Sequence, residues 1–312
     1  MTRSEWPALD WQQWRETAVH LQLMTQVVGK IRLALTPWLN HGWHVPLYVT
    51  PRGLGTSSIP SEAGAFEIEL DLQAHVLRVT CAAGGARTRP LEAGTIAAFY
   101  GDLMAMLAAL GIEVTIATLP NEMPDPVRFP EDHAERPYDG EAVTRFHQAL
   151  LAVDRVFKHF RTAFLGKASP VHFFWGSFDL AVTRFSGRAA PPHPGGVPGL
   201  PDAVTREAYS HEVSSAGFWP GSDAWPRAAF YSYAYPAPEG FAAASIRPEA
   251  AYYTPELGEF VLDYEIVRAA TDPEAILLDF LQSTYGAAAT LGHWDRAALE
   301  CGLGETRKPR KV

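Results

Sequence analysis

Helical and strand-like spacings of apolar residues alternate in the first third of the chain. Apolar residues recur at steps of three and four over residues 10–36, which predicts a largely buried helix ended by Pro37. Apolar and acidic residues alternate strictly over 66–72, as in a strand with one buried face. Further strands are expected at 45–50, 76–81, 86–91 and 114–118, and a second helix over 95–110, before Gly111. This order predicts an antiparallel sheet covered by helices.

Residues 119–138 interrupt this pattern. Five prolines and many acidic residues occupy the segment, which cannot sustain a helix. We therefore expect a linker between a first α+β half, residues 1–118, and the rest of the chain.

The pattern after the linker predicts a second α+β half, residues 139–300. Apolar residues from Phe146 to Phe164 follow the spacing 4, 3, 4, 3, 4, which is the core stripe of a long helix expected to end at Gly166. Strands are expected at 171–175, 178–185, 228–235 and 250–262. Asp272 and Pro273 then match the N-cap and first position of a last helix, which ends near Gly292.

Both halves read helix, strands, helix, and VPLYVT at 45–50 resembles FDLAVT at 178–183. The fold class expected is therefore α+β, with two pseudo-repeated α-β-β-β-β-α halves whose antiparallel sheets are covered by long helices. Residues 301–312 form a basic tail. A duplicated layout favours a ligand site in a groove between the halves.

The segment 171–183 predicts a β-hairpin. Gly176 and Ser177 match a two-residue type II′ loop, with Gly176 at the position that needs a positive φ. The resulting register places His172 and Asp179 on one face of the hairpin, and Trp175 and Arg184 on the other. A carboxylate near an imidazole fixes its tautomer and raises its basicity. The alternative is a polar pair that is satisfied within the sheet.

A second concentration of polar side chains lies at 206–221. His211 and Glu212 begin like the zinc-protease motif HExxH, but its fifth position is Ser215, so the motif is absent. Tyr209 precedes this pair, and the stretch GFWPG at 217–221 is a rigid aromatic turn, able to wall a pocket with Trp219. The alternative is a well-satisfied loop.

Charge and cysteine content narrow the function classes. The chain has 26 Lys and Arg against 35 Asp and Glu, a net charge of −9, which argues against a general nucleic-acid binder. Two distant cysteines form no disulfide framework and fit a reducing cytoplasm. The N-terminal residues lack the apolar region of a signal peptide, and no stretch reads as a membrane span. We expect a cytoplasmic protein that acts on neither nucleic acid nor membrane.

These residues suggest an enzyme that acts on a small polar or anionic molecule in a pocket between the halves. The expected catalytic residues are His172, Asp179, His211 and Glu212, and the expected substrate-binding residues are Trp175, Arg184, Arg188, Tyr209 and Trp219. The alternative is a non-catalytic module that binds a small molecule or a protein through an aromatic-lined pocket. A zinc or iron site on His172, His193, His211 and Glu212 stays open as a third reading, although their spacing matches no ligand signature. The oligomeric state stays open.

Several stretches resemble a known family. They include GKIRLALTPW at 29–38, VPLYVT at 45–50, PVHFFWGSFDLAVTRFSGR at 170–188, EAYSHE at 207–212 and GFWPG at 217–221. Together they are similar to an uncharacterised bacterial family catalogued as domain of unknown function 5996, over nearly the whole chain. The resemblance implies a bacterial, cytoplasmic protein whose halves form one unit, and it carries over no catalytic residue.

Overall fold

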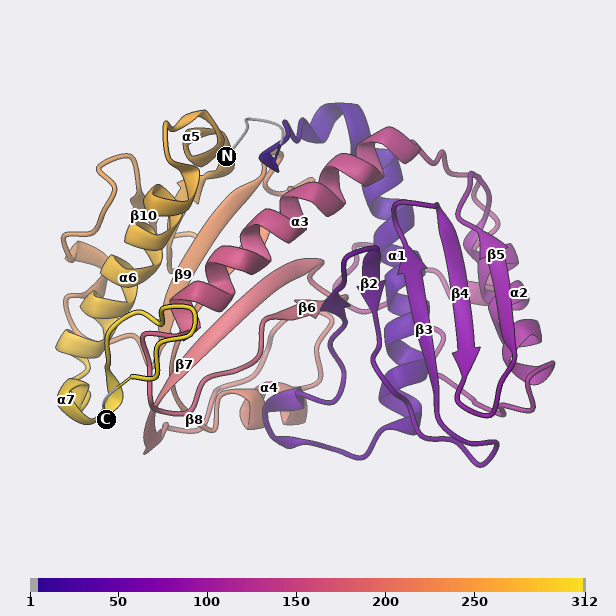
Figure 1. The fold of residues 1–312 in the computed structure, drawn as a ribbon, viewed down its shortest axis with the longest axis horizontal. Helices are drawn as coiled ribbons and strands as arrows, with labels where there is room; N and C mark the ends of the chain where they lie inside the picture. The colour runs from indigo at the N-terminus through magenta and orange to yellow at the C-terminus, as the bar shows by residue number, and fades with distance from the viewer. Residues whose placement is uncertain (1–4, 311–312) are drawn as a thin grey trace.

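The computed structural model describes residues 5–310 and contains two antiparallel sheets that lie side by side (Figure 1). The five-stranded sheet has the order β1-β2-β3-β4-β5, with β1 (Tyr48–Val49), β2 (Gly53–Gly55), β3 (Phe66–Asp71), β4 (Val76–Cys81) and β5 (Ala86–Pro90). The six-stranded sheet has the order β10-β11-β9-β8-β7-β6, with β6 (His172–Phe174), β7 (Asp179–Ala189), β8 (His211–Trp219), β9 (Ala229–Tyr235), β10 (Tyr252–Thr254) and β11 (Glu259–Asp263). Leu47 bridges Phe173, so the two sheets adjoin at β1 and β6. The α+β class is confirmed.

Helices cover the two sheets on different sides. In Figure 1, α3 and α6 cross the front of the six-stranded sheet, whereas α1 and α2 lie behind the five-stranded sheet. The helices are α1 (Trp11–Leu35), α2 (Ile96–Ala108), α3 (Gly140–Arg161), α4 (Asp202–Ala208), α5 (Tyr264–Ala269), α6 (Pro273–Leu291) and α7 (Arg296–Leu299). Short 3-10 turns occur at η2 (Asn40–Gly42), η3 (Phe129–Glu131) and η4 (Phe241–Ala243).

The helices begin where their capping residues predict. The carboxylate of Asp272 accepts a hydrogen bond from the Ala275 N–H at 3.1 Å, and Pro273 occupies the first helical position of α6, as expected. Asp10 and Asp139 cap α1 and α3 in the same way. The expected helices at 10–36 and 95–110 and the strands at 66–72, 76–81 and 86–91 are confirmed within one or two residues.

The 171–183 hairpin has the predicted register but a different loop. His172 pairs with Ala181 and Phe174 with Asp179, as expected. The two-residue loop was wrong: the turn runs over 175–178, and Phe178, not Gly176, has the left-handed backbone, with φ 58°. Phe178 is the last residue of this turn, and it carries the positive φ while its aromatic side chain stays buried.

Three other expectations about elements were wrong. Residues 114–118 form no strand, and α3 ends at Arg161, well before Gly166. Sequence periodicity also left β8 unassigned, because its alternate positions are small and polar rather than apolar.

The expected linker is ordered and packed. Phe129 is fully buried, and Arg136 forms an ion pair with Asp132 at 2.9 Å. Buried apolar side chains from both halves, including Trp14, Leu70 and Phe218, belong to one continuous core. The halves carry five and six strands, and their pseudo-repeat and the boundaries at 118, 138 and 300 stay predictions.

The basic tail folds back on itself at Lys308, which pairs with Glu305, and Arg310 donates to Cys301 Sγ at 2.7 Å; Lys311 lies outside the described residues.

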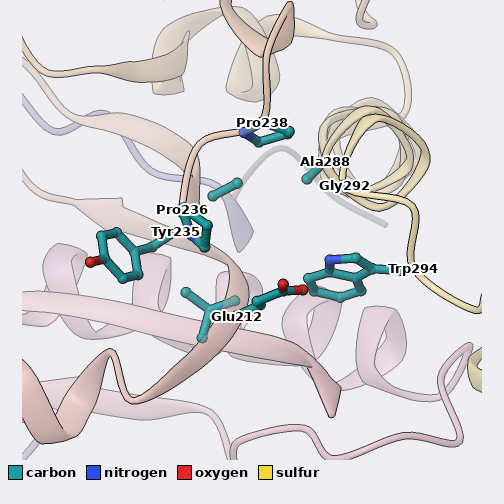
Figure 2. Close-up of a pocket in the computed structure, with 9 residues that line it drawn as sticks. Glu212, Tyr235, Pro236, Pro238, Ala288, Gly292 and Trp294 are labelled. Atoms are coloured by element: carbon teal, nitrogen blue, oxygen red, sulfur yellow. The ribbon is translucent and has the colours of Figure 1, made fainter. Parts of the chain in front are cut away.

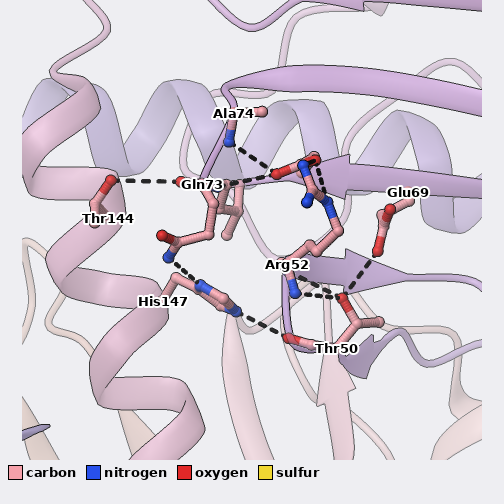
Figure 3. Close-up of polar contacts among 10 residues, drawn as sticks. Thr50, Arg52, Glu69, Gln73, Ala74, Thr144 and His147 are labelled. Carbon is pink, nitrogen blue, oxygen red and sulfur yellow. Dashed lines mark hydrogen bonds and ion pairs between the residues drawn. The ribbon is translucent and has the colours of Figure 1, made fainter.

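A polar junction ties α3 to the five-stranded sheet (Figure 3). His147 Nε2 lies 2.9 Å from the Thr50 carbonyl oxygen, and the Gln73 amide lies 2.8 Å from His147 Nδ1, so the ring donates through Nε2 and accepts at Nδ1. Buried Asp71 accepts from Arg52 Nε at 2.6 Å and from the Ala74 N–H at 2.8 Å. Burial alone would raise its pKa, but these donors lower the pKa of Asp71 below its ordinary value.

From Glu5 to Arg310, no helix is both long enough and apolar enough to cross a membrane.

Candidate functional site

The side of the six-stranded sheet that faces away from α3 and α6 carries a ladder of aromatic rings. Arg184 on β7 contacts Phe160 of α3 and Tyr285 of α6, so its side of the strand faces the helices. Register places Ala181, Gly217 and Tyr231 in one row on the opposite side. On that outer side, Trp219 stacks on Tyr231 with ring centroids 4.4 Å apart, and Tyr231 stacks on Tyr233 at 6.1 Å.

Asp179 is the first residue of β7, lies on this outer side and is almost fully buried. One of its carboxylate oxygens accepts from the Ser177 hydroxyl and the other from the Tyr231 hydroxyl. Tyr231 reaches β7 from β9 by crossing over Gly217, where a Cβ would overlap its ring and hydroxyl. Burial raises the pKa of Asp179, and the two donors oppose that rise.

Hydroxyl groups continue from Asp179 along the sheet. Tyr233 and Tyr209 share a hydrogen bond between their hydroxyls at 2.9 Å, and Thr183 and Ser215 share another at 2.9 Å. Burial raises the pKa of both tyrosines, so their phenols stay protonated and can donate.

Glu122 comes to this site from the linker. Its backbone has φ 53°, a left-handed conformation that is uncommon for a residue with a side chain. Its side chain is exposed to water, yet its Oε1 lies against Gly176, where a Cβ would overlap it. Desolvation by the surrounding protein, followed by the charge of Asp179, raises the pKa of Glu122 to about 7.

The strained position of Glu122 is imposed by its neighbour Asn121. The Asn121 backbone exchanges two hydrogen bonds with the Gln26 side chain, both at 2.8 Å, and its amide oxygen accepts from Lys30 Nζ at 2.5 Å. Its amide nitrogen donates to the Gly199 carbonyl at 2.8 Å. The side chains of Gln26 and Lys30, which come from α1, are both buried. A left-handed residue held by such a fixed neighbour is typical of functional sites.

Glu259 on β11 is the third carboxyl group. Its Oε2 is buried and has no hydrogen-bond partner among the described residues. Burial, followed by the charge of Asp179, raises the pKa of Glu259 to about 8. We name Glu122, Asp179, Glu259, Tyr209, Tyr231 and Tyr233 the carboxylate–tyrosine cluster.

The cluster is suited to proton transfer rather than to metal binding. Burial, followed by the charge of Asp179, raises the pKa of Glu122 to about 7 and that of Glu259 to about 8, so these two groups can exchange protons near neutral pH within a coupled cluster. None of the ion pairs formed by residues 5–310 involves them. Over the same residues, no group of three or more His, Cys, Asp or Glu side chains is arranged to hold a metal ion.

The structure brings together four of the residues proposed from sequence. Asp179 and Tyr209 belong to the cluster, and Trp219 stacks on Tyr231. His193, proposed as a metal ligand, stacks on Tyr209 with centroids 4.9 Å apart, and its Nδ1 accepts from the Gly195 N–H at 3.0 Å.

His172 shares the face of Asp179, but its ring lies among other aromatic rings. Trp43, Tyr48 and Phe174 surround it at centroid distances of 5.6–5.9 Å, and its Nε2 is buried without a partner among the described residues. Burial, with the charges of Arg32 and Arg161, lowers the pKa of His172 to about 3. The imidazole is therefore neutral, and within residues 5–310 it forms no hydrogen bond with Asp179.

Two proposed substrate-binding residues lie in the core instead. Trp175 packs against Gly29 of α1 and donates from its indole to the Val45 carbonyl at 2.9 Å. Arg184 lies on the helix-facing side of β7, opposite to Asp179, because the two positions differ by an odd number of residues. One pocket cannot contain both Arg184 and Asp179.

The remaining proposed residues lie at the far end of β7 and β8. Arg188 pairs with Glu212 at 2.6 Å and donates to the His293 carbonyl at 3.0 Å, which ties β8 to the end of α6. His211 contacts the ring of His41 at a centroid distance of 5.6 Å. The expectation that His211 and Glu212 lie beside Asp179 is therefore wrong, because His211 pairs with Ala189 at the opposite end of β7. His172 does lie diagonal to Asp179 on the expected face.

Glu212 lines a small cavity of about 140 Å³ (Figure 2). In the figure its carboxylate points toward the Trp294 ring, with Tyr235, Pro236 and Pro238 on the other side. The walls are mostly apolar, and the only carboxylate is the one already paired with Arg188.

The sequence analysis did not predict Glu122 and Glu259 as site residues. Glu122 lies in a proline-rich segment with no periodicity, and Glu259 is one of two acids at the ends of a short strand. One signal was available: Tyr231, Tyr233 and Tyr235 alternate, which places three hydroxyls on one face of a strand.

Comparison with known proteins identifies a family but no activity. A family model described as a family of unknown function, DUF5996, matches residues 6–301. No curated protein and no solved structure matches the chain.

Proposed function

Since the chain belongs to DUF5996, a family of unknown function, its activity has to be argued from its own geometry, and we propose that it is an enzyme. The proposed activity is acid–base chemistry on a small, uncharged polar molecule at the carboxylate–tyrosine cluster. This keeps the acid–base role expected for Asp179 and replaces the expected histidines by Glu122 and Glu259.

One observation carries the proposal. The charges of three carboxyl groups, from the linker, β7 and β11, add to burial in raising the pKa of Tyr209, and Asp179 also accepts from the Tyr231 hydroxyl. A left-handed backbone holds Glu122, the carboxyl group that stays open to water. Structural carboxylates are normally paired with cations or hydrogen-bond donors, because an unpaired buried charge is costly. Carboxyl groups gathered without a paired cation are typical of sites where they act on a ligand.

The electrostatics of the cluster favour an uncharged substrate. Three acidic groups without a paired cation repel an anion. Carboxyl groups with pKa values of about 7 and about 8 can each donate or accept a proton near neutral pH, which is the requirement for a general acid and a general base. Glu122 is exposed and can exchange its proton with water. Hydroxyl or carbonyl groups of the substrate would bind the phenols of Tyr209 and Tyr233.

A titration tests the chemical premise. Carbon-13 NMR of glutamate-labelled protein would follow the carboxyl carbons from pH 4 to 9, assigned with Glu122→Gln and Glu259→Gln. We expect both residues to titrate near pH 7 to 8. The matched control is Glu256→Gln, which removes an exposed glutamate that accepts from Thr254, three residues from Glu259. Titration of both Glu122 and Glu259 near 4.5 would contradict the proposal.

A ligand screen tests the substrate class. Neutral polyols, sugars and small amides would be compared with organic anions by saturation-transfer NMR. Binding of a neutral compound that is lost in E122Q and E259Q but kept in E256Q supports the proposal. Binding of an organic anion that is lost in E122Q and E259Q would refute the proposal.

The cavity of Figure 2 favours a second candidate, a non-catalytic module that binds a small apolar ligand. Its walls of Tyr235, Pro236, Pro238 and Trp294 match an aromatic-lined pocket. If Trp294→Ala abolished binding of such a ligand while E122Q did not, this candidate would replace the enzyme.

A further inference from the structure

Arg184 is a fully buried arginine without a carboxylate partner. Its guanidinium donates to the Phe160 carbonyl and, at 3.4 Å, to the Gln282 side chain, and its Nε has no partner among the described residues. Buried arginines normally pair with carboxylates, because desolvation of a lone charge is expensive.

Aromatic rings partly compensate for that missing partner. The guanidinium carbon lies 3.5 Å from the ring centroid of Phe160, 4.3 Å from Tyr285 and 5.1 Å from Phe164. Such contacts hold a cation in place but do not neutralise it. Burial lowers the pKa of Arg184 to about 10, so the group is still charged at neutral pH.

Arg184 lines a cavity of about 320 Å³ between α6 and the C-terminal segment. The other lining residues are Ala163, Gln282, Tyr285, Arg296, Glu300, Cys301 and Leu303. Glu300 is already engaged: it pairs with Arg296 at 2.5 Å and accepts from the Tyr285 hydroxyl at 3.0 Å. The cavity lining therefore holds one positive charge in excess.

The cavity is large enough for a small molecule. At about 30 Å³ per water, its volume equals roughly ten water molecules. Arg296 and Gln282 are accessible and can contact a ligand directly, whereas Arg184, although it belongs to the lining, has no surface open to water. Ala163, Tyr285 and Leu303 add apolar surface, which suits a hydrocarbon portion.

We propose that this cavity binds a small organic monocarboxylate, with its carboxylate toward Arg296 and Gln282 and its hydrocarbon part against Leu303. Arg184 supplies the uncompensated positive charge behind them. The site lies on the helix-covered side of the sheet, opposite to the carboxylate–tyrosine cluster, so it is independent of the proposed enzymatic function.

Acetate, isovalerate and benzoate are the probes, measured by isothermal titration calorimetry on the full chain. Benzamide serves as the uncharged match for benzoate, and inorganic phosphate tests for a general oxyanion site. The NMR signal of the Arg184 Nε–H gives a local readout, because that proton has no competing partner among the described residues. We expect a carboxylate to bind and to shift this signal, and benzamide to do neither.

Three variants locate the binding. Arg296→Gln removes a direct contact and frees the negative charge of Glu300, so it should weaken binding at least about tenfold. Leu303→Trp fills the cavity without changing charge and should abolish binding; Leu303 is exposed enough for the larger ring to be accommodated. Arg268→Gln, which breaks an exposed ion pair with Glu265, is the control that should change nothing.

Arg184→Met separates binding from folding. The Phe160 carbonyl still accepts hydrogen bonds from the N–H groups of Thr162 and Ala163, so the variant leaves this buried acceptor with partners. Removal of an uncompensated buried charge should leave the melting temperature unchanged or higher, while carboxylate binding is lost. A large fall in the melting temperature, failure of all three carboxylates to bind, or binding of phosphate alone would overturn the proposal.

Discussion

Gly217 provides the sharpest test of how the carboxylate–tyrosine cluster is built. A glycine inside a strand normally costs about 0.5–1 kcal/mol relative to alanine, so Gly217→Ala should stabilise an ordinary sheet. Here the Tyr231 ring lies directly over Gly217, and an added Cβ would overlap its Cζ and hydroxyl. The ring must move, and its hydrogen bond to Asp179 must break.

The magnitude follows from these two losses. A hydrogen bond to a charged group contributes about 1.5–3 kcal/mol, and overpacking a dense site costs about 1–3 kcal/mol. After subtraction of the usual gain from alanine, the free energy of unfolding should fall by about 2–5 kcal/mol. That is a large part of the stability of an ordinary domain.

Urea unfolding at pH 7 measures this change. Gly286→Ala in α6 is the matched control: nothing lies within 4 Å of its added Cβ, and alanine should stabilise the helix by up to about 1 kcal/mol. Tyr231→Phe isolates the hydrogen bond, since it removes only the hydroxyl. If Gly217→Ala proved neutral or stabilising, the crossing of β8 by Tyr231 would not be what holds Asp179.

Three further outcomes are expected. The pKa values of Glu122 and Glu259 are raised in the folded state, so their contribution to stability is present below about pH 4.5 and is lost as the pH rises toward 7 to 8. Chemical unfolding across this pH range should show that the free energy of unfolding falls. In the double variant E122Q/E259Q, the free energy of unfolding should depend less on pH. Asp179→Asn removes a charge that raises both values, so NMR titration should find each pKa lower than in the wild type. The pKa of Asp71 is lowered instead, so its stabilisation is present above about pH 4 and is lost as the pH falls through its folded value; Asp71→Asn should cost about 1.5–3 kcal/mol at pH 7, and the difference from wild type in urea unfolding should shrink at pH 3.

Local patterns predicted the elements that depend on local physics. The caps and apolar stripes of α1, α3 and α6 and the pairing of Phe174 with Asp179 follow from spacing along a short stretch. β8 could not be predicted in this way, because Ser214, Ser215 and Gly217 show no alternation of apolar and polar residues. Pairing with β7 and β9 determines where these residues lie. Tertiary context determines such a strand.

The carboxylate–tyrosine cluster was harder to predict because its parts come from distant segments. Glu122 and Glu259 have ordinary sequence surroundings, and only folding places both near Asp179. Asn121 gives no signal in the sequence either, since its partners Gln26 and Lys30 lie about 90 residues away on α1.

Strand parity, however, already separates two of the residues once assigned to one pocket. Asp179 and Arg184 lie five positions apart on β7, and successive side chains alternate between faces, so an acidic site on one face excludes Arg184. The six-stranded sheet therefore separates unpaired acids on its outer face from an unpaired cation on its inner face. If the two met, they would neutralise each other as an ordinary buried ion pair. Because the backbone of β7 holds them on opposite faces, neither group neutralises the other, and the two sites that we propose on this strand can differ in the ligands that they bind.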